Sequence, residues 1–319
     1  MDIEKILNRT LSDDRQFGII YSIDPGDDWT SEASLRKANP NYDISVSGEF
    51  LRGQVKRAMD SPTKQNITKT KHLNVWVGAR EAWLNLESWD RCADTSLKRE
   101  DFVDVPCVIG IDLATRVDLA AISQVFQRKE ADGRTHYYAF TDSFVPEKAL
   151  EISKNAHRFN NWANQGFLTV HNDAEIDLVA IQAYLIGEDG GRSKGLAFEY
   201  DCKEVAYDPW QASQLAQCLG DAGATVLEFR HTVGNMSPAM KELEGAINSG
   251  RFHFDGNPVL SWCASNTTAK ADRKDNYYPN KQTDDNKIDC MIALLMAIGR
   301  SMAQVDNTSK YESQPMVLL

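Results

Sequence analysis

The pattern of apolar and polar positions changes character near residue 100. Up to residue 98 the segments are short and irregular, with turn signals at Asp24-Pro25-Gly26 and Asn39-Pro40-Asn41. One helical stretch is predicted there, around Gly48–Asp60. Beyond residue 100, apolar runs of strand and helix length alternate. The two parts of the chain are therefore expected to differ in architecture.

The longer part predicts a mixed α/β domain. Val105–Leu113 is apolar on both faces, as a central buried strand is. Further strands are expected at Asp118–Arg128, Thr135–Val145, Lys203–Tyr207 and Ala224–Phe229. Helices are expected at Glu147–Gln165, Ile176–Ile186, Gln211–Leu219, from Ser237-Pro238 to Gly250, and at Lys287–Ala303. This order suits a ribonuclease H-like mixed sheet flanked by helices, preceded by a smaller irregular and helical segment.

Two features mark the boundary between these parts. Trp76, Trp83 and Trp89 have roughly helical offsets, which predict an aromatic seam that docks on a neighbouring element. The charged stretch Ser96–Asp101 is typical of a linker. We therefore expect a first segment at residues 1–98, the α/β domain at residues 105–303, and a polar, flexible tail at residues 304–319.

Composition narrows the class of protein. A hydrophobic content of 42% supports a folded core. The six cysteines stand singly, without zinc-site spacing, and indicate reduced thiols in a cytoplasmic protein. The sequence has no signal peptide and no run of about 18 apolar residues. The net charge of -11 argues against a protein that coats nucleic acid by bulk electrostatics, but an enzyme that grips DNA locally stays possible.

Aspartates at strand ends are the candidate chemistry. Asp112 follows the apolar strand, and ligands of open α/β sheets bind beyond such strand ends. An aspartate there needs a partner or a cation, although it could also be a simple turn residue. Asp118 opens the next strand and either faces the same space or caps the hairpin.

Two later aspartates could join the first. Asp208 ends another strand, but Asp208-Pro209 is also a good N-cap and first-turn pair for the next helix. Asp289 lies on the last helix at the edge of its buried stripe, where an ionised carboxylate is costly unless paired. Asp284 and Asp285 are explained more simply, since acidic residues in a first turn favour the helix dipole.

Asp112, Asp208 and Asp289 can converge on one point and offer the hard oxygen ligands that Mg²⁺ prefers. Two such ions would activate water for in-line displacement at a phosphodiester, without a histidine or serine nucleophile. The six histidines form no cluster, so surface or core placement is expected for His72, His136, His157, His171, His231 and His253. Since 46 acidic residues allow many triplets, this spacing is weak evidence by itself.

Several stretches strengthen the prediction that these three aspartates form one site. They closely resemble the large subunit of tailed-bacteriophage terminases. The matching stretches are FGIIYSIDPGDDWTSEASLRKANPNY, NVWVGAREAWLNLESW, GIDLATRVDLAAIS, AYDPWQAS, HTVGNMSPAMKELE, NPVLSWCASN and NKIDCMIALLMAIGR. The resemblance implies a nuclease domain whose catalytic, metal-binding carboxylates are Asp112, Asp208 and Asp289, with Asp118 as an accessory ligand. It also implies two Mg²⁺ or Mn²⁺ ions as cofactors.

Terminase large subunits are DNA-packaging motors with an ATPase domain before the nuclease domain, and the chain departs from the family in the ATPase domain. No phosphate-binding loop GxxxxGK[ST] is present, and no apolar strand ending in Asp-Glu precedes residue 98. Residues 1–98 are therefore expected to be the end of an ATPase domain and its linker. ATP hydrolysis by this chain alone is not expected.

A basic segment before the last helix is the candidate DNA contact. It contains Lys270, Arg273, Lys274 and Lys281, together with two tyrosines, and Lys287 follows. Basic side chains beside a metal site can hold phosphates, which position a duplex without reading its bases. A solvated loop with ordinary lysines is the alternative.

These features predict a metal-dependent endonuclease that cuts concatemeric double-stranded phage DNA at packaging. The resemblance implies the terminase small subunit and the portal protein as partners, and the cytoplasm of the infected bacterial host as the location. One alternative is a non-catalytic motor remnant that binds DNA or the portal. An integrase- or resolvase-like nucleotidyl transferase shares the metal chemistry, but the stretches outside the three aspartates do not support it.

Overall fold

The computed structural model of the chain describes residues 15, 17–24, 27–59, 62–75, 83–113, 118–187, 194–272 and 275–305. The chain forms two compact units, Met1–Glu81 and Ala82–Leu319. No helix within these ranges is long and apolar enough to cross a membrane.

The first unit is a small helical unit. Its helices are α2 (Glu32–Ala38), α3 (Gly48–Met59) and α4 (Pro62–His72), of which only α3 was expected. Ser31 caps α2 by accepting a hydrogen bond from the Ser34 backbone N–H. Leu35 and Leu51 are fully buried in its core. The polar sequence of α4 carries little apolar periodicity, which explains why the pattern did not predict that helix.

The second unit begins well before residue 98, the boundary expected from the sequence. Trp83 lies outside any helix, and its backbone N–H donates to the Thr267 carbonyl oxygen at 2.9 Å. Trp89 lies in the short helix α5 (Leu86–Asp90) and is fully buried. The ring of Trp89 packs 4.8 Å from that of Phe254, centroid to centroid. The prediction that these tryptophans dock on neighbouring elements is thus confirmed for Trp83 and Trp89, but no continuous helix joins the two. Trp76 lies outside the described residues.

The interpretation of Ser96–Asp101 as a linker is wrong. The 3-10 helix η1 (Arg99–Phe102) runs through it, and the Phe102 ring packs 5.0 Å from that of Phe126. The guanidinium of Arg99, only 19% exposed, lies 2.7 Å from a carboxylate oxygen of Asp142. A stretch of charged residues suggests a solvated segment, but here one charge is paired inside the fold and one aromatic ring anchors it.

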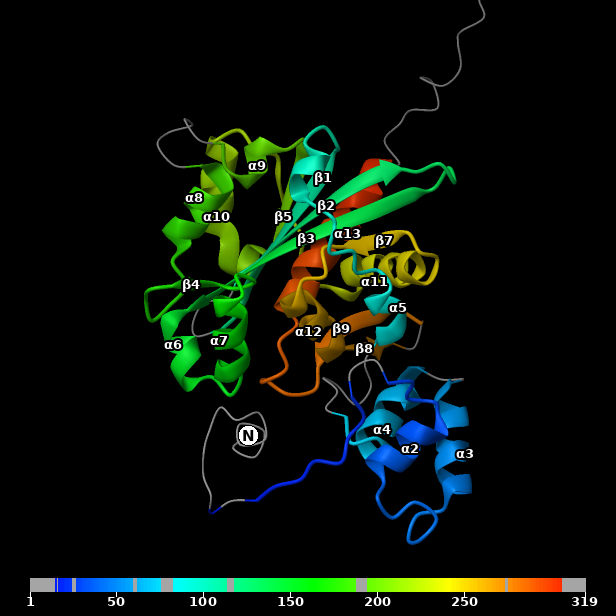
Figure 1. Ribbon diagram of the computed structural model, residues 1–319. Helices are drawn as coiled ribbons and strands as arrows, with labels where there is room; N and C mark the ends of the chain where they lie inside the picture. The colour runs from blue at the N-terminus through cyan, green and yellow to red at the C-terminus, as the bar shows by residue number, and fades with distance from the viewer. Residues whose placement is uncertain are drawn as a thin grey trace, which may run out of the picture. The chain divides into compact units, whose positions relative to one another are not determined.

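A mixed sheet forms the centre of the second unit (Figure 1). Its strands are β1 (Cys107–Asp112), β2 (Ala120–Lys129), β3 (Thr135–Pro146), β4 (Thr169–His171), β5 (Cys202–Tyr207), β6 (Val226–Glu228) and β7 (Phe252–Phe254). Their order is β4-β3-β2-β1-β5-β6, with β7 also beside β3. Only β2 runs antiparallel to its neighbours, so the other six strands end at the same edge, called here the carboxyl edge. The predicted mixed α/β class is confirmed.

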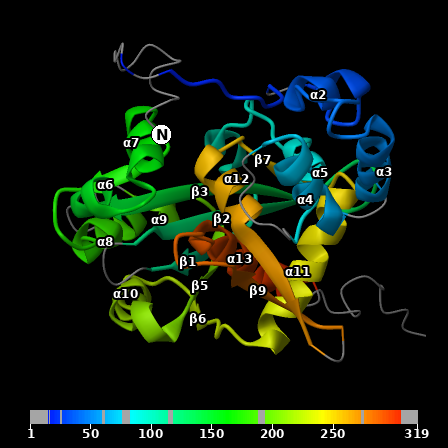
Figure 2. The same cartoon turned by 90° about the horizontal axis from the view of Figure 1, so that it is seen from below.

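Helices cover both faces of this sheet (Figures 1 and 2). They are α6 (Glu147–Ile152), α7 (Ala156–Asn164), α8 (Leu178–Ile186), α9 (Leu196–Glu199), α10 (Pro209–Asp221), α11 (Val233–Asn248), α12 (Pro258–Asn266) and α13 (Asp289–Val305). Helices α8, α9 and α10 pack on one face, where Ile109 and Ile111 of β1 point. Helices α11, α12 and α13 pack on the other, which receives Val108 and has Gly110 directly beneath α13. The strict alternation along β1 assigns Asp112 to the α13 face.

Several predicted helix bounds are corrected. The expected helix Glu147–Gln165 is two helices, because α6 ends at Ile152. Helix α11 begins at Val233 rather than at Ser237-Pro238, since Thr232 caps it and Pro238 lies inside. The predicted stop at Gly250 is confirmed by its positive φ of 68°.

The end of the unit also differs from the expectation. Helix α13 begins at Asp289, so this aspartate is the first helical residue rather than an internal one. The basic segment before it forms a hairpin of β8 (Thr267–Ala271) and β9 (Tyr277–Lys281), which the sequence pattern did not predict.

Candidate metal centre

The parallel topology gathers the predicted aspartates at the carboxyl edge. Asp112 is the last residue of β1, and Asp208 directly follows β5, the parallel neighbour of β1. Asp118 lies just before β2, whose antiparallel start meets the end of β1 where Asp112 pairs with Ala121. Asp289 begins α13, which packs on β1. Four carboxylates from four elements therefore share one edge of the sheet.

Asp112 and Asp289 are two carboxyl groups of this cluster whose pKa is raised. Burial raises the pKa of Asp112 well above its usual range, and repulsion from Asp289 and Asp208 adds to the shift. Burial also raises the pKa of Asp289 to about 6, with Asp118 as the main repelling neighbour. Both side chains nevertheless keep partial contact with solvent. Repulsion between neighbouring carboxylates disfavours their ionised forms, and a cation placed among them would offset it.

Asp118 has one cationic partner among the described residues. The Lys287 ammonium lies 2.8 Å from a carboxylate oxygen of Asp118 and is only 15% exposed. Lys287 was expected to contact DNA, but the structure places it mainly against the carboxylates. Its charge also offsets part of the upward pKa shift of Asp289.

Asp208 serves two neighbours at once. Its Oδ1 accepts a hydrogen bond from the Trp210 backbone N–H at 3.2 Å, so the N-cap role expected for Asp208-Pro209 is confirmed. Its Oδ2 lies 3.3 Å from Nδ1 of His231, whose Nε2 is buried and finds no hydrogen-bond acceptor or donor within the described ranges. Burial lowers the pKa of His231, which favours the neutral ring.

His231 is the site residue that the sequence analysis missed. No histidine was expected near the aspartates, because the six are scattered along the chain. A usable signal was present, however. His231 lies three residues beyond the end of β6, the parallel neighbour of β5, and Phe229 donates its backbone N–H to the Tyr207 carbonyl oxygen. The strand-end rule applied to β6 would have found it.

The carboxylates are gathered, but their oxygens are not yet arranged around a single point. Within the described ranges, no three histidine, cysteine, aspartate or glutamate side chains have the geometry to hold a metal ion as they stand. Asp118 and Asp208 face Lys287 and His231 instead. A cation at this edge would have to draw these two carboxylates away from those partners.

The hairpin β8–β9 supplies neighbouring groups. Burial raises the pKa of the Tyr278 phenol, and the nearby charges of Asp208 and Asp112 add to the shift. Lys270 is the cross-strand partner of Tyr278 and is exposed. Lys281 is near enough to lower the pKa of Asp289. Arg273 and Lys274, predicted to contact DNA with them, lie outside the described residues.

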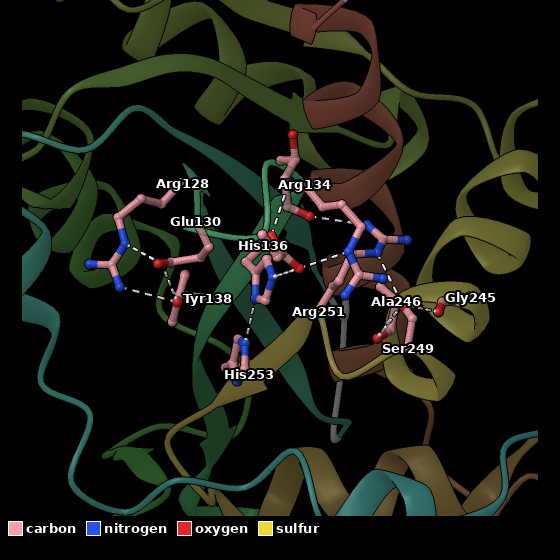
Figure 3. A network of polar contacts seen from close by, with 12 residues as sticks. Arg128, Glu130, Arg134, His136, Tyr138, Gly245, Ala246, Ser249, Arg251 and His253 are labelled. Carbon is pink, nitrogen blue, oxygen red and sulfur yellow. Dashed lines mark hydrogen bonds and ion pairs between the residues drawn. The ribbon is translucent and has the colours of Figure 1, made fainter.

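A second polar cluster lies at the opposite edge of the sheet, around the β2–β3 turn (Figure 3). The rings of His136 and His253 stack, with Nδ1 and Nε2 3.0 Å apart. Asp132 contacts both His136 and the Arg134 guanidinium, the latter at 2.7 Å. The acidic groups of this cluster thus have cationic partners. Asp112 and Asp289, whose pKa is raised by burial and by neighbouring carboxylates, lie at the carboxyl edge instead.

Comparison with known families agrees with this geometry. A sequence model of the family described as "Terminase large subunit, endonuclease domain" matches residues 10–304. The chain belongs to this terminase family. The matched span includes the strand ends and the helix that carry the four aspartates. It also reaches back into the first unit, so the assignment of residues 1–98 to an ATPase domain stays a prediction.

Individual curated relatives match most of the chain. Protein YmfN of Escherichia coli strain K12 is 41% identical over 310 residues, which are 94% of this chain and 66% of that protein. The terminase large subunit of Enterobacteria phage HK97 is 25% identical over 90% of the chain and 54% of its own length. This chain therefore spans about half to two thirds of the curated relatives' lengths.

A solved terminase structure shares the mixed α/β fold of this chain. The crystal structure of the HK97 bacteriophage large terminase matches with a TM-score of 0.55 and 24% identity, over 93% of this chain and 59% of that one. The predicted terminase resemblance is thus confirmed at the level of family and fold.

Proposed function

We propose that this terminase chain is a metal-dependent DNA endonuclease that cuts concatemeric double-stranded DNA during packaging. The observation that carries the proposal is the gathering of Asp112, Asp118, Asp208 and Asp289 at one edge of the sheet, where their charges repel one another. Family membership supports a nuclease, and phosphodiester hydrolysis is the chemistry that clustered carboxylates serve in such an enzyme.

The donor set fits divalent ions. Asp112, Asp208 and Asp289 would hold Mg²⁺ or Mn²⁺, with Asp118 as an accessory ligand, because hard oxygen donors suit these ions. Two bound ions would supply an ionised water and stabilise charge on the leaving oxygen. Asp112 and Asp289 are half-buried and repel each other, so cation binding would relieve a cost that the folded chain otherwise bears.

Other side chains would position these ligands and the substrate. His231 restrains Asp208 through its Nδ1, and such partners orient ligands and tune their affinity for metal. Lys270 and Lys281, on the hairpin that brings Tyr278 to the cluster, would hold DNA phosphates, together with Arg273 and Lys274. Lys287 would act mainly on Asp118 and, through it, on the ligand set.

Metal dependence is the first test. Supercoiled plasmid incubated with the chain should be nicked and linearised in Mg²⁺ or Mn²⁺, and excess EDTA should abolish cutting. Both ions should also raise the melting temperature of the chain, since a ligand that binds only the folded state stabilises it. Absence of cutting under both ions would favour the alternative, a non-catalytic module that binds DNA or the portal.

Phosphate contact by the hairpin predicts a salt-dependent effect. Lys270→Ala should weaken duplex binding equally for unrelated sequences and reduce the slope of log affinity against log salt by about 0.9. Lys129→Ala is the matched control, since Lys129 is an exposed lysine at the end of β2, at the opposite edge of the sheet. Binding measured across a range of salt concentrations separates the two; equal slopes for both variants would remove Lys270 from the DNA contact.

The setting of the reaction follows from the family. We infer that the terminase small subunit and the portal protein are partners and that the chain acts in the cytoplasm of the infected bacterial host. Carboxylates and phosphate-binding lysines do not read bases, so we expect the small subunit to direct the cut.

A further inference from the structure

Trp210 is a large aromatic side chain left in solvent beside the carboxylate cluster. It is the second residue of α10 and is 88% exposed. Within the described part of the chain, its indole takes part in no ring stacking, no cation–π contact and no hydrogen bond. A tryptophan usually buries most of its surface, so one that stands free at a candidate site is suited to a binding partner.

The fold fixes where Trp210 stands. Its backbone N–H donates to Oδ1 of Asp208 at 3.2 Å, which ties the first turn of α10 to the cluster. Helices α8, α10 and α11 follow the parallel strands β4, β5 and β6, so all three begin at the carboxyl edge. Each of these helices begins with exposed apolar side chains, namely Leu178 and Val179 of α8, Trp210 of α10 and Val233 of α11.

A cation lies on the same edge. Arg230 is 71% exposed and sits between β6 and α11, one residue before His231, which contacts Asp208. Among the described residues, its guanidinium pairs only with Glu228, at 3.3 Å and at the solvent surface. A flat apolar ring two residues after Asp208, and a solvated guanidinium on the residue before His231, match the two parts of a nucleotide, its base and its phosphate.

We propose that Trp210 stacks on a nucleobase of the DNA strand whose phosphodiester lies at the carboxylate cluster. The inference rests on the proposed endonuclease function, because a phosphodiester held at cations that Asp112 and Asp208 would bind brings its neighbouring nucleotides to the first turn of α10. Stacking of this kind tolerates any sequence, since each base has a π face. It requires a base that is unpaired or turned out of the duplex, so Trp210 favours a locally opened helix at the cut.

Two substitutions test the contact. Trp210→Ala should raise both the dissociation constant and the KM for a duplex of about 30 base pairs by about 10-fold, and Trp210→Phe should stay within about threefold of the parent because it keeps an aromatic face. A 2-aminopurine placed beside the cleaved bond should change its fluorescence when the parent binds in Ca²⁺, and not when Trp210→Ala binds. A duplex with one unpaired base at that position should bind the parent more tightly than the intact duplex.

Matched controls keep the outcome readable. Val103→Ala changes an exposed apolar residue before the start of β1, at the opposite edge, and should leave all DNA parameters unchanged. Melting temperatures of the three variants should equal that of the parent, since the side chains are exposed. If the parent neither binds nor cuts DNA, the proposed function itself fails. If the parent cuts and Trp210→Ala binds and cuts equally well, the stacking contact is overturned, as it is if that variant changes only self-association.

Discussion

Replacing Asp112 with asparagine should abolish DNA cleavage while leaving the fold intact. The substitution keeps the shape of the side chain and removes the charge at the centre of the cluster, where Asp289 and Asp208 both act on it. We expect a fall in cleavage rate of more than about 100-fold, beyond the roughly 10- to 100-fold that loss of a ligand's hydrogen-bond partner costs. Plasmid cleavage in Mg²⁺ and Mn²⁺ measures it.

The same variant should be at least as stable as the parent in EDTA. Burial and repulsion hold the pKa of Asp112 above its unfolded value, so ionisation of this group lowers the free energy of unfolding as pH rises. Asparagine removes that penalty, and the difference in melting temperature should be largest near about pH 8 and shrink toward about pH 4, where the unfolded carboxyl also takes up its proton. In Mg²⁺ the order should reverse, because only the parent gains from metal binding.

Asp201→Asn is the matched control for this experiment. Asp201 directly precedes β5 at the edge opposite Asp208, and its carboxylate pairs with Lys203 at 2.6 Å in solvent. Parent-like cleavage by this variant would tie the loss to the carboxyl edge rather than to negative charge in general. Substantial cleavage by Asp112→Asn would contradict the assigned role of Asp112.

The strand-end rule predicted most of the aspartate cluster, because topology alone decides which edge a parallel strand ends on. Asp112 and Asp208 needed only a strand assignment and a shared direction. The neighbours of these carboxylates were harder to predict from the sequence. His231 contacts Asp208 and needed the same strand-end rule applied to β6, a strand of only three residues. Trp210 could not be recognised from the sequence, where it looks like an ordinary apolar residue in a helix, because only the structure shows that its side chain is exposed.

Predictions from composition failed where tertiary contacts changed the meaning of a charged stretch. Arg99 looked like part of a solvated linker, yet its guanidinium is held between Asp142 and the Tyr184 hydroxyl. The hairpin that carries Lys270 and Tyr278 was missed because its turn and strands are rich in polar residues, and it gains stability from packing on α11 instead. In both cases a long-range partner, absent from the local sequence, decides the structure.

Gly110→Ala should strongly destabilise the second unit, because Gly110 is where α13 rests directly on β1. A Cβ at this position would stand closer to the Ala293 carbonyl oxygen than any real contact allows, and 2.9 Å from the Ala297 backbone nitrogen. Neither atom belongs to a side chain that can rotate away, so α13 itself must move. Overpacking of a core typically costs about 1–3 kcal/mol, and a clash with backbone falls at or above about 3 kcal/mol. The melting temperature should fall by about 10 °C.

The same displacement should reach the candidate metal centre, since α13 begins at Asp289 and β1 ends at Asp112. Gly110→Ala should therefore need more Mg²⁺ for half-maximal cleavage than the parent, even well below its melting temperature. Gly245→Ala is the control. Gly245 lies exposed within α11, a Cβ added there would meet nothing within 4 Å, and alanine should stabilise the helix by about 0.5–1 kcal/mol. Equal melting temperatures for both variants would show that α13 does not pack on β1 as described.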